Sequence, residues 1–342
     1  MAAERYRTAD DDLDQNHREA LDQAVKNVLS TDIALATFAQ IIDGLPLSDV
    51  AWDTRGTKLT PQHPINLHTQ LCPGTLDKAR AYRERFSLDL LFFKPEIFDA
   101  FGSSSPSSRT FMLRLLELTA AAIHQAAVFV FQMKLNLHDP TTTSNISVED
   151  VTNWERPPDD LARVVPYPTL FTQSHFIAYG KYPEGVADMV GYWAEDRILG
   201  GVLLFDHSQG WDDETNPEPN AYIHPNRRTA TFRICQLLDQ QQQRLFDFLR
   251  EGKHDGSEDE GIPVLPTLEN RHRIDQADAI PVHKVYRDIW ERADGSHTSR
   301  RRKRRDVVRE IDYPELTVDA QMRNIHEAES LAREVDPDQN GE

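Results

Sequence analysis

The sequence predicts an α/β chain of the α+β type, in which a helical N-terminal half packs on a mainly antiparallel β-sheet. Residues 15–138 carry apolar residues at helical spacing, whereas residues 160–250 hold short β-prone runs separated by turn residues. The end of the chain is acidic and poor in apolar residues, which is typical of a disordered tail. We expect one globular domain over residues 15–296, then a basic block and a disordered acidic tail over residues 297–342.

The helical part is expected to centre on one long helix over residues 107–137. From Ala120 onward this segment is apolar on nearly every face, as in a core helix. Glu117, His124 and nearby glutamines interrupt its apolar run, so it falls short of the ~20 residues that a membrane span needs. The sequence therefore predicts a buried core helix with a satisfied core histidine at His124, and no membrane segment.

The middle third is expected to form a meander of short strands before a helix over residues 237–250. Residues 262–292 are extended and proline-containing, and we expect them to wrap along the surface of the core. The predicted strands are residues 170–171, 176–179, 189–194, 198–205, 221–224 and 229–235.

Charge and cysteine content limit the partners and the compartment. The 342 residues hold 56 acidic and 38 basic side chains and have a net charge of −18, which argues against broad non-specific binding to polyanions. Part of the negative charge lies in residues 306–342, so the rest of the chain is less acidic than the total suggests. A nucleic-acid partner is therefore not excluded. Only two cysteines are present, and the first 14 residues lack the apolar segment of a signal peptide. We expect a cytoplasmic protein.

Familiar nucleotide and nucleophile motifs are absent from the sequence. It contains no Gly-x-Ser-x-Gly elbow, no phosphate-binding loop with its lysine and no dinucleotide fingerprint, so no cofactor is predicted. His63, His68 and Cys72 form an H-x4-H-x3-C array. Pro64 and Pro73 would break a helix that aligned these side chains, and a fourth ligand is not obvious. We therefore predict no metal site.

The densest polar segment is Tyr192–Arg197. If it is a strand, alternation places Tyr192 and Asp196 on one face and Trp193 and Glu195 on the other. A carboxylate that is partly buried against an aromatic ring has a raised pKa and can act as a general acid or base. Glu195 and Asp196 are thus the predicted catalytic residues. The alternative is a strand end followed by an acidic hairpin loop.

Charged residues after this segment are candidates for binding. The acidic loop that contains Asp212, Asp213 and Glu214 could bind a divalent cation or a guanidinium group, although it could also simply face water. A basic block, residues 300–305, could contact phosphates, serve as a nuclear-import signal or balance the acidic tail. The predicted substrate-binding residues are Tyr192, Trp193, Asp206, Asp212, Asp213 and Glu214.

The middle of the chain resembles a large group of filamentous-fungal proteins that is close to the fungal arginine-containing cyclodipeptide synthases. The resemblance covers about residues 45–316. It is carried by Gly191–Asp206 (GYWAEDRILGGVLLFD), Tyr222–His224 (YIH), Thr231–Ile234 (TFRI), the glutamine run 240–243, and Val285–Asp288 (VYRD) with Trp290. The serine and tyrosine signature of the bacterial cyclodipeptide synthases is not present.

This resemblance implies an enzyme that joins two amino acids, one of them arginine, from aminoacyl-tRNAs into a cyclic dipeptide. Its partners would be arginyl-tRNA and a second charged tRNA, and Glu195 or Asp196 would transfer the proton. Two other classes stay open from the residues alone: a non-catalytic interaction protein and a metal-dependent hydrolase. The expected tRNA contacts are Arg227, Arg228, Arg233, Arg300 and Arg301.

Overall fold

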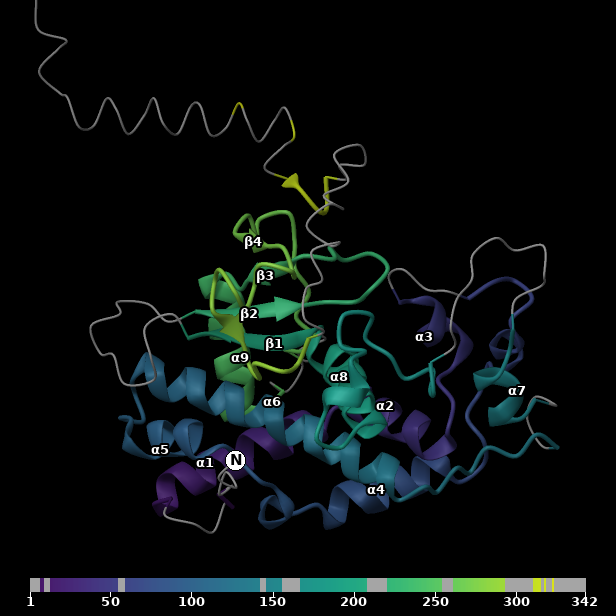
Figure 1. Cartoon of the computed structure of the whole chain (residues 1–342). Coiled ribbons are helices and arrows are strands. Elements are labelled where there is room, and N and C mark those ends of the chain that lie inside the picture. The colour runs from purple at the N-terminus through teal and green to yellow at the C-terminus, as the bar shows by residue number, and fades with distance from the viewer. Residues whose placement is uncertain are drawn as a thin grey trace, which may run out of the picture.

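The computed structural model describes residues 7–8, 13–54, 59–141, 146–155, 167–207, 220–253, 261–292, 310–314, 317 and 322. Its α-helices are α1 Gln15–Leu29, α2 Asp32–Asp43, α3 Ser48–Trp52, α4 Thr75–Arg85, α5 Pro95–Ser103, α6 Arg109–Gln132, α7 Val148–Thr152, α8 Val186–Leu199 and α9 Asp239–Glu251. Its strands are β1 Val202–Asp206, β2 Ala221–His224, β3 Ile234–Gln236, β4 Arg273–Ile274 and β5 Val285–Tyr286. In Figure 1 the sheet lies above the layer that contains α1, α5 and α6.

Short polar side chains begin the helices of this layer. The side chains of Asp14, Thr31 and Ser108 accept hydrogen bonds from the backbone N–H groups three residues on, which caps α1, α2 and α6. Gly44 ends α2 in the left-handed conformation, with φ of 108°. These caps fix where each helix starts and stops, and so they set which faces meet in the core.

The helix α6 is the centre of the fold, because α1, α2, α5, α8 and α9 all pack against it. It has the length and composition of a membrane span, but 83% of its apolar window is buried inside the protein. Leu115, Ile123 and Val130 are among its buried residues. The predicted core helix is therefore confirmed, and the fold is consistent with a soluble protein.

Within the described residues the sheet has five strands in the order β4-β3-β2-β1-β5, and every neighbouring pair is antiparallel. Alternate residues of β1 enter two different cores. Leu203 and Phe205 pack with the helical core, whereas Val202 and Leu204 pack in a second core on the other face. The predicted mainly antiparallel sheet on a helical half is confirmed. Because β4 and β5 belong to this sheet, part of residues 262–292 builds the sheet instead of only covering it.

The predicted strand over residues 189–194 is wrong, because these residues lie in the helix α8. Every described residue of α8 from Ala187 to Leu199 except Arg197 is buried. A helix that is buried on all sides shows no amphipathic period, so its sequence looks like that of a buried strand. Gly200, at φ of 101°, then turns the chain from α8 into β1. Residues 170–171 and 176–179 are likewise not strands.

Only small parts of the predicted tail lie among the described residues. Asp312 is buried and accepts a hydrogen bond from the Thr231 hydroxyl at 3.1 Å, while its backbone carbonyl accepts one from Arg233 Nη1. This short segment therefore packs on the sheet domain. The basic block at residues 300–305 and nearly all of the acidic tail lie outside the described residues.

The close packing of α8 on α6 depends on Gly191, and this gives a first prediction. A Cβ atom at this position would lie 2.6 Å from the ring of His124. We expect Gly191→Ala to reduce the free energy of unfolding by about 1–3 kcal/mol through overpacking, measured by urea denaturation. The control is Gly180→Ala, because a Cβ at Gly180 meets no atom within 4 Å. Equal stabilities for the two variants would contradict the close approach of these helices.

Candidate functional site

One face of α8 carries three polar residues toward α6. Asp188, Tyr192 and Glu195 are spaced by four and three residues, so the helical geometry aligns them. His124 reaches them from the middle of α6, above Gly191. The two helices cross in the centre of Figure 1. The polar residues of the predicted site are thus assembled between helices and not across a strand.

These side chains and Arg287, which follows β5, form the network that we call the Glu195 network (Asp188, His124, Glu195 and Arg287). His124 Nδ1 lies 2.8 Å from Glu195 Oε1, and His124 Nε2 lies 2.9 Å from Asp188 Oδ1. Arg287 Nη1 donates to Glu195 Oε2 at 2.8 Å. All four residues are buried. The predicted satisfied core histidine is therefore confirmed, although its partners are charged.

The charges within the Glu195 network balance. Burial alone would lower the pKa of His124, but the hydrogen bonds to Asp188 and Glu195 raise it overall. Both ring nitrogens then donate to carboxylates, and the ring is an imidazolium. Two cations thus face two anions. Such a balanced set can stay buried, whereas removal of one member would leave an uncompensated charge.

Tyr192 connects this network to the second core. Its ring lies 4.5 Å from that of His124 and 4.4 Å from that of Phe176, and the Arg287 guanidinium carbon lies 5.3 Å from its centroid. Burial raises the pKa of its hydroxyl well above the ordinary value, so the hydroxyl keeps its proton. Among the described residues this hydroxyl, which is fully buried, finds no hydrogen-bond partner.

Two further groups around Phe176 share this property. The His224 ring lies 5.8 Å from the Phe176 ring, and the Arg292 guanidinium carbon lies 5.0 Å from it. Within the part of the chain that the structure describes, His224 Nδ1 and Arg292 Nη1 and Nη2 are buried without hydrogen-bond partners. We call Phe176, Tyr192, His224 and Arg292 the Phe176 cluster.

The protonation state of His224 is set by its surroundings. Burial, together with the charges of His175 and Arg292, holds its pKa well below the ordinary value, so the ring is neutral. Its Nε2 lies 3.1 Å from the carbonyl oxygen of Phe232 and therefore carries the hydrogen. The lone pair is left on Nδ1. His224 thus offers an unpaired base in a buried position.

The Phe176 cluster therefore places a base, a hydroxyl and a guanidinium around one aromatic ring. A buried polar group without a partner costs about 1–3 kcal/mol, and such groups are rare in folded proteins. Three of them around one ring are a strong indication of a binding or catalytic position. The arrangement can take a proton, relay a proton and stabilise a negative oxygen.

Asp196 lies on another side of α8 and belongs to a different set of contacts. Its Oδ1 accepts a hydrogen bond from the backbone N–H of Asn226 at 2.7 Å, and its Oδ2 lies 3.9 Å from Arg227 Nε. Asp53 binds both Arg197 and Arg227 at 2.9 Å. Burial raises the pKa of Asp196 to about 6, although Arg227 and Arg197 oppose this shift. Glu195 and Asp196 therefore do not share a site.

The other predicted site residues are scattered. Trp193 packs on Phe171 in the helical core, with ring centroids 4.7 Å apart, and Asp206 is half-buried at the end of β1. Arg227 and Arg233 are buried among internal partners, whereas the side chain of Arg228 is exposed. Five predicted residues lie outside the described residues: Asp212, Asp213, Glu214, Arg300 and Arg301.

Sequence reasoning did not assign a role to Asp188, His224, Arg287 or Arg292. Two of them do lie in segments that carry the family resemblance, Tyr222–His224 and Val285–Asp288. For His224 and Arg287 that resemblance was the available signal, because no local spacing relates these two residues to α8. Asp188 lies in α8 itself, so its helical spacing to Tyr192 and Glu195 was the signal for it. In another part of the fold, Asp43, His68 and His138 bring ligand atoms within 4.8 Å of one another. His63 is not part of this group, since it accepts from the backbone N–H of Ile65 and packs on Trp154.

Comparisons with known proteins identify no relative of this chain. The chain matches no protein-family model, no curated protein and no solved structure. A function for the chain therefore has to be inferred from the geometry of the Phe176 cluster and from the resemblance in the sequence.

The charge balance of the Glu195 network gives a prediction about Glu195→Gln. Glutamine cannot compensate the charges of His124 and Arg287, so we expect a loss of about 3–5 kcal/mol in the free energy of unfolding. Urea denaturation measures this loss. The control is Glu84→Gln, at an exposed position on α4, which should change stability by less than about 0.5 kcal/mol. A Glu195→Gln variant as stable as this control would show that the network does not hold the helices together.

The raised pKa of Asp196 predicts a pH dependence of stability. Between its ordinary value of 3.8 and about 6, the folded protein binds a proton that the unfolded chain releases. The contribution of Asp196 to the free energy of unfolding is therefore greatest at pH 4 and falls as the pH rises to 6. Asp196→Asn keeps the acceptor for Asn226 but does not titrate. We expect the stability difference between wild type and this variant to fall by up to about 3 kcal/mol from pH 4 to pH 6.5. A difference that is constant or rises with pH would contradict this.

Proposed function

We propose that this chain is a cytoplasmic, aminoacyl-tRNA-dependent cyclodipeptide synthase that makes an arginine-containing cyclic dipeptide for secondary metabolism. The observation that carries the proposal is the Phe176 cluster, in which Tyr192 and His224 are buried, Arg292 is partly buried, and each has buried polar atoms without hydrogen-bond partners among the described residues. Tyr192 and His224 both belong to segments of the resemblance. The chemistry of the cluster also suits acyl transfer.

The reaction consists of two aminoacyl transfers. In the first, the amine of one aminoacyl-tRNA attacks the ester carbonyl of the other, a C–N bond forms, the C–O bond to the tRNA breaks, and the amine proton passes to the leaving ribose oxygen. In the second, the free amine of the dipeptidyl-tRNA attacks its own ester in the same way, and the ring closes. Neither step needs a nucleotide or an electron carrier, which agrees with the absence of a phosphate-binding loop from the sequence.

The unpaired groups of the Phe176 cluster match these requirements. His224 Nδ1, as a neutral base, accepts the amine proton. The Tyr192 hydroxyl donates its proton to the leaving ribose oxygen and regains one from protonated His224, so both groups return to their starting states, and the Arg292 guanidinium stabilises the negative charge on the carbonyl oxygen. The burial of all three strengthens these interactions, because water does not screen them.

Glu195 has a positioning role in this proposal. Its two oxygens already bind His124 and Arg287, and both of these partners lie against the Tyr192 ring. The carboxylate thus holds the ring whose hydroxyl reaches the substrate. The acidic residues expected to bind the arginyl side chain, Asp212, Asp213 and Glu214, stay predictions, and so do all of the expected tRNA contacts, including the exposed Arg228.

The direct test is an assay with purified protein, arginyl-tRNA and each other charged tRNA in turn. Mass spectrometry would detect a diketopiperazine with one arginine. We expect product with at least one pair, and uncharged tRNA with free amino acids should give none. Failure of every charged pair, with protein shown to be folded, would overturn the proposed function.

Tyr192→Phe is the sharpest test of the site within this assay. The change removes a hydroxyl that has no partner among the described residues, so stability should stay the same or rise by up to about 1 kcal/mol. Product formation should fall at least ten-fold if the hydroxyl relays the proton. Thermal unfolding and initial rates of product formation measure the two effects.

Tyr222→Phe provides a matched control, because Tyr222 is buried in the same second core. We expect it to keep product formation within two-fold of wild type. Equal activities of the Tyr192→Phe and Tyr222→Phe variants would remove Tyr192 from the mechanism, even if the protein makes a cyclic dipeptide.

A further inference from the structure

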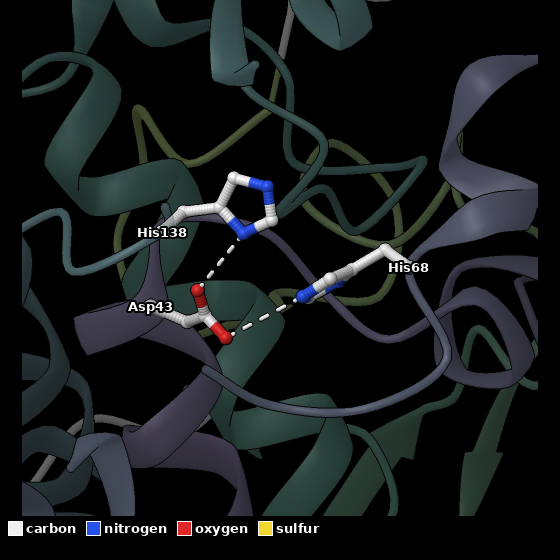
Figure 2. Close-up of side chains that lie close together, drawn as sticks. All are labelled: Asp43, His68 and His138. Carbon is white, nitrogen blue, oxygen red and sulfur yellow. Dashed lines mark hydrogen bonds and ion pairs between the residues drawn. The ribbon is translucent and has the colours of Figure 1, made fainter. Parts of the chain in front are cut away.

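A second buried polar group lies at the far ends of α2 and α6. Asp43 is the last residue of α2, His68 follows the short turn Pro64–Leu67, and His138 follows α6. Figure 2 shows the Asp43 carboxylate facing both imidazole rings, with one oxygen toward His138 and the other toward His68. The side chains of all three residues are 0% exposed. We call Asp43, His68, His138 and the neighbouring Cys72 the Asp43 cluster.

The distances in this cluster are short, and the ligand atoms of Asp43, His68 and His138 all lie within 4.8 Å of one another. His138 Nδ1 lies 3.1 Å from Asp43 Oδ1, and His68 Nε2 lies 3.4 Å from Asp43 Oδ2. The Cys72 sulfur lies 3.5 Å from the same nitrogen of His138. The backbone N–H of Cys72 also donates to Asp43 Oδ2 at 2.9 Å and so orients the carboxylate.

The outer nitrogen of each ring is fixed by a backbone carbonyl. His68 Nδ1 lies 2.8 Å from the oxygen of Pro46, and His138 Nε2 lies 2.9 Å from the oxygen of Ile146. These outer nitrogens must carry hydrogens, because a carbonyl oxygen only accepts. In the neutral rings the lone pairs then point inward. A backbone carbonyl behind each imidazole is the usual support of a metal-binding histidine.

The inner side of the cluster is incompletely satisfied by the protein itself. Across the described ranges, His68 Nε2 is a buried atom without a hydrogen-bond partner. Two neutral rings would direct two lone pairs at a carboxylate, whereas two protonated rings would leave an excess of positive charge. Although burial opposes it, the contact with Asp43 raises the pKa of His68 overall, so without a metal one protonated ring would pair with the carboxylate. One divalent cation with two neutral imidazoles, the Asp43 carboxylate and a Cys72 thiolate gives a net charge of zero.

We propose that the Asp43 cluster binds one zinc ion through Asp43, His68, His138 and Cys72. Nitrogen, oxygen and thiolate ligands in a set of four are typical of tetrahedral zinc. Ligand atoms around zinc at its usual bond lengths are separated by about 3.3–3.6 Å, and the observed separations of 3.1, 3.4 and 3.5 Å lie close to this range. Cys72 is not among the three residues whose ligand atoms all lie within 4.8 Å of one another, so it would complete the set only after its side chain rotates toward the ion.

The full burial and the four protein ligands assign the ion a structural role. Zinc sites that keep a position for substrate are usually open, whereas this one is closed by protein. It joins the end of α2, the segment around residues 68–72 and the chain after α6, which are already tied by backbone hydrogen bonds such as His138 N to Asp43 O at 2.8 Å. This site is separate from the Phe176 cluster and does not depend on the proposed function.

Elemental analysis of the purified full-length protein tests the stoichiometry. After dialysis against buffer without chelator, we expect one zinc ion per chain. Replacement by cobalt should then give the visible bands of a tetrahedral ion together with a thiolate-to-cobalt charge-transfer band near the ultraviolet. Folded protein that retains less than 0.1 zinc or cobalt per chain, roughly the background of such an assay, would overturn the site.

Variants distinguish the residues that bind the metal from residues that only contribute to the fold. Cys72→Ser should abolish the charge-transfer band and lower zinc affinity at least ten-fold, whereas Cys235→Ser, at the other buried cysteine, should keep both. His68→Gln should lose the metal, and His63→Gln, the matched control nearby, should keep it. A charge-transfer band that persists in Cys72→Ser would overturn Cys72 as a ligand. If Cys72→Ser does not fold, thermal unfolding of wild type with and without a chelator replaces it, and an unchanged midpoint would count against the site.

Discussion

The fold depends on the requirement that a buried charge must meet an opposite charge. Glu195 can be fully buried only because His124 of α6 and Arg287 after β5 both contact it. One carboxylate thereby joins three segments that are far apart in the sequence. It ties the long core helix to α8 and both of them to the edge strand of the sheet. Packing of apolar surface alone would not specify this single arrangement.

The same interaction decides where Tyr192 lies. The sheet is buried on both faces, and α8 contributes Trp193 to the helical core and Tyr192 to the second core. Neighbouring residues of a helix point about 100° apart, so a helix that is buried on all sides can serve two cores at once. The Glu195 network then locks the Tyr192 ring from one side while Phe176 stacks on the other. Its hydroxyl is therefore presented at a fixed position.

Sequence reasoning could predict the layers of this fold but not the partners of its charged residues. Residues 120–132 are apolar enough to mark α6 as a core helix, whereas burial of α8 on every side removes the period of 3.6 on which such a prediction rests. Glu195 was singled out as a buried carboxylate, and it is buried, but its partners lie 71 and 92 residues away.

The H-x4-H-x3-C array shows the same limit. His68 and Cys72 do lie together, but spacing alone could not supply Asp43 and His138, which come from the ends of two different helices.

The three polar clusters differ in how many of their polar atoms find hydrogen-bond or charge partners within the protein. This difference separates structural roles from binding roles. The Glu195 network has equal numbers of cations and anions and every ring nitrogen of its histidine is paired, so it needs nothing from outside. The Asp43 cluster leaves His68 Nε2 without a hydrogen-bond partner among the described residues, and this is the position that we assign to a cation. The Phe176 cluster leaves the Tyr192 hydroxyl, His224 Nδ1 and the two terminal nitrogens of Arg292 without hydrogen-bond partners among the described residues, whereas Arg292 Nε is paired with Glu291, so the cluster suits a ligand that both donates and accepts hydrogen bonds. An aminoacyl ester with a free amine offers both kinds of group, which is why the least satisfied cluster is the one to which we assign the chemistry.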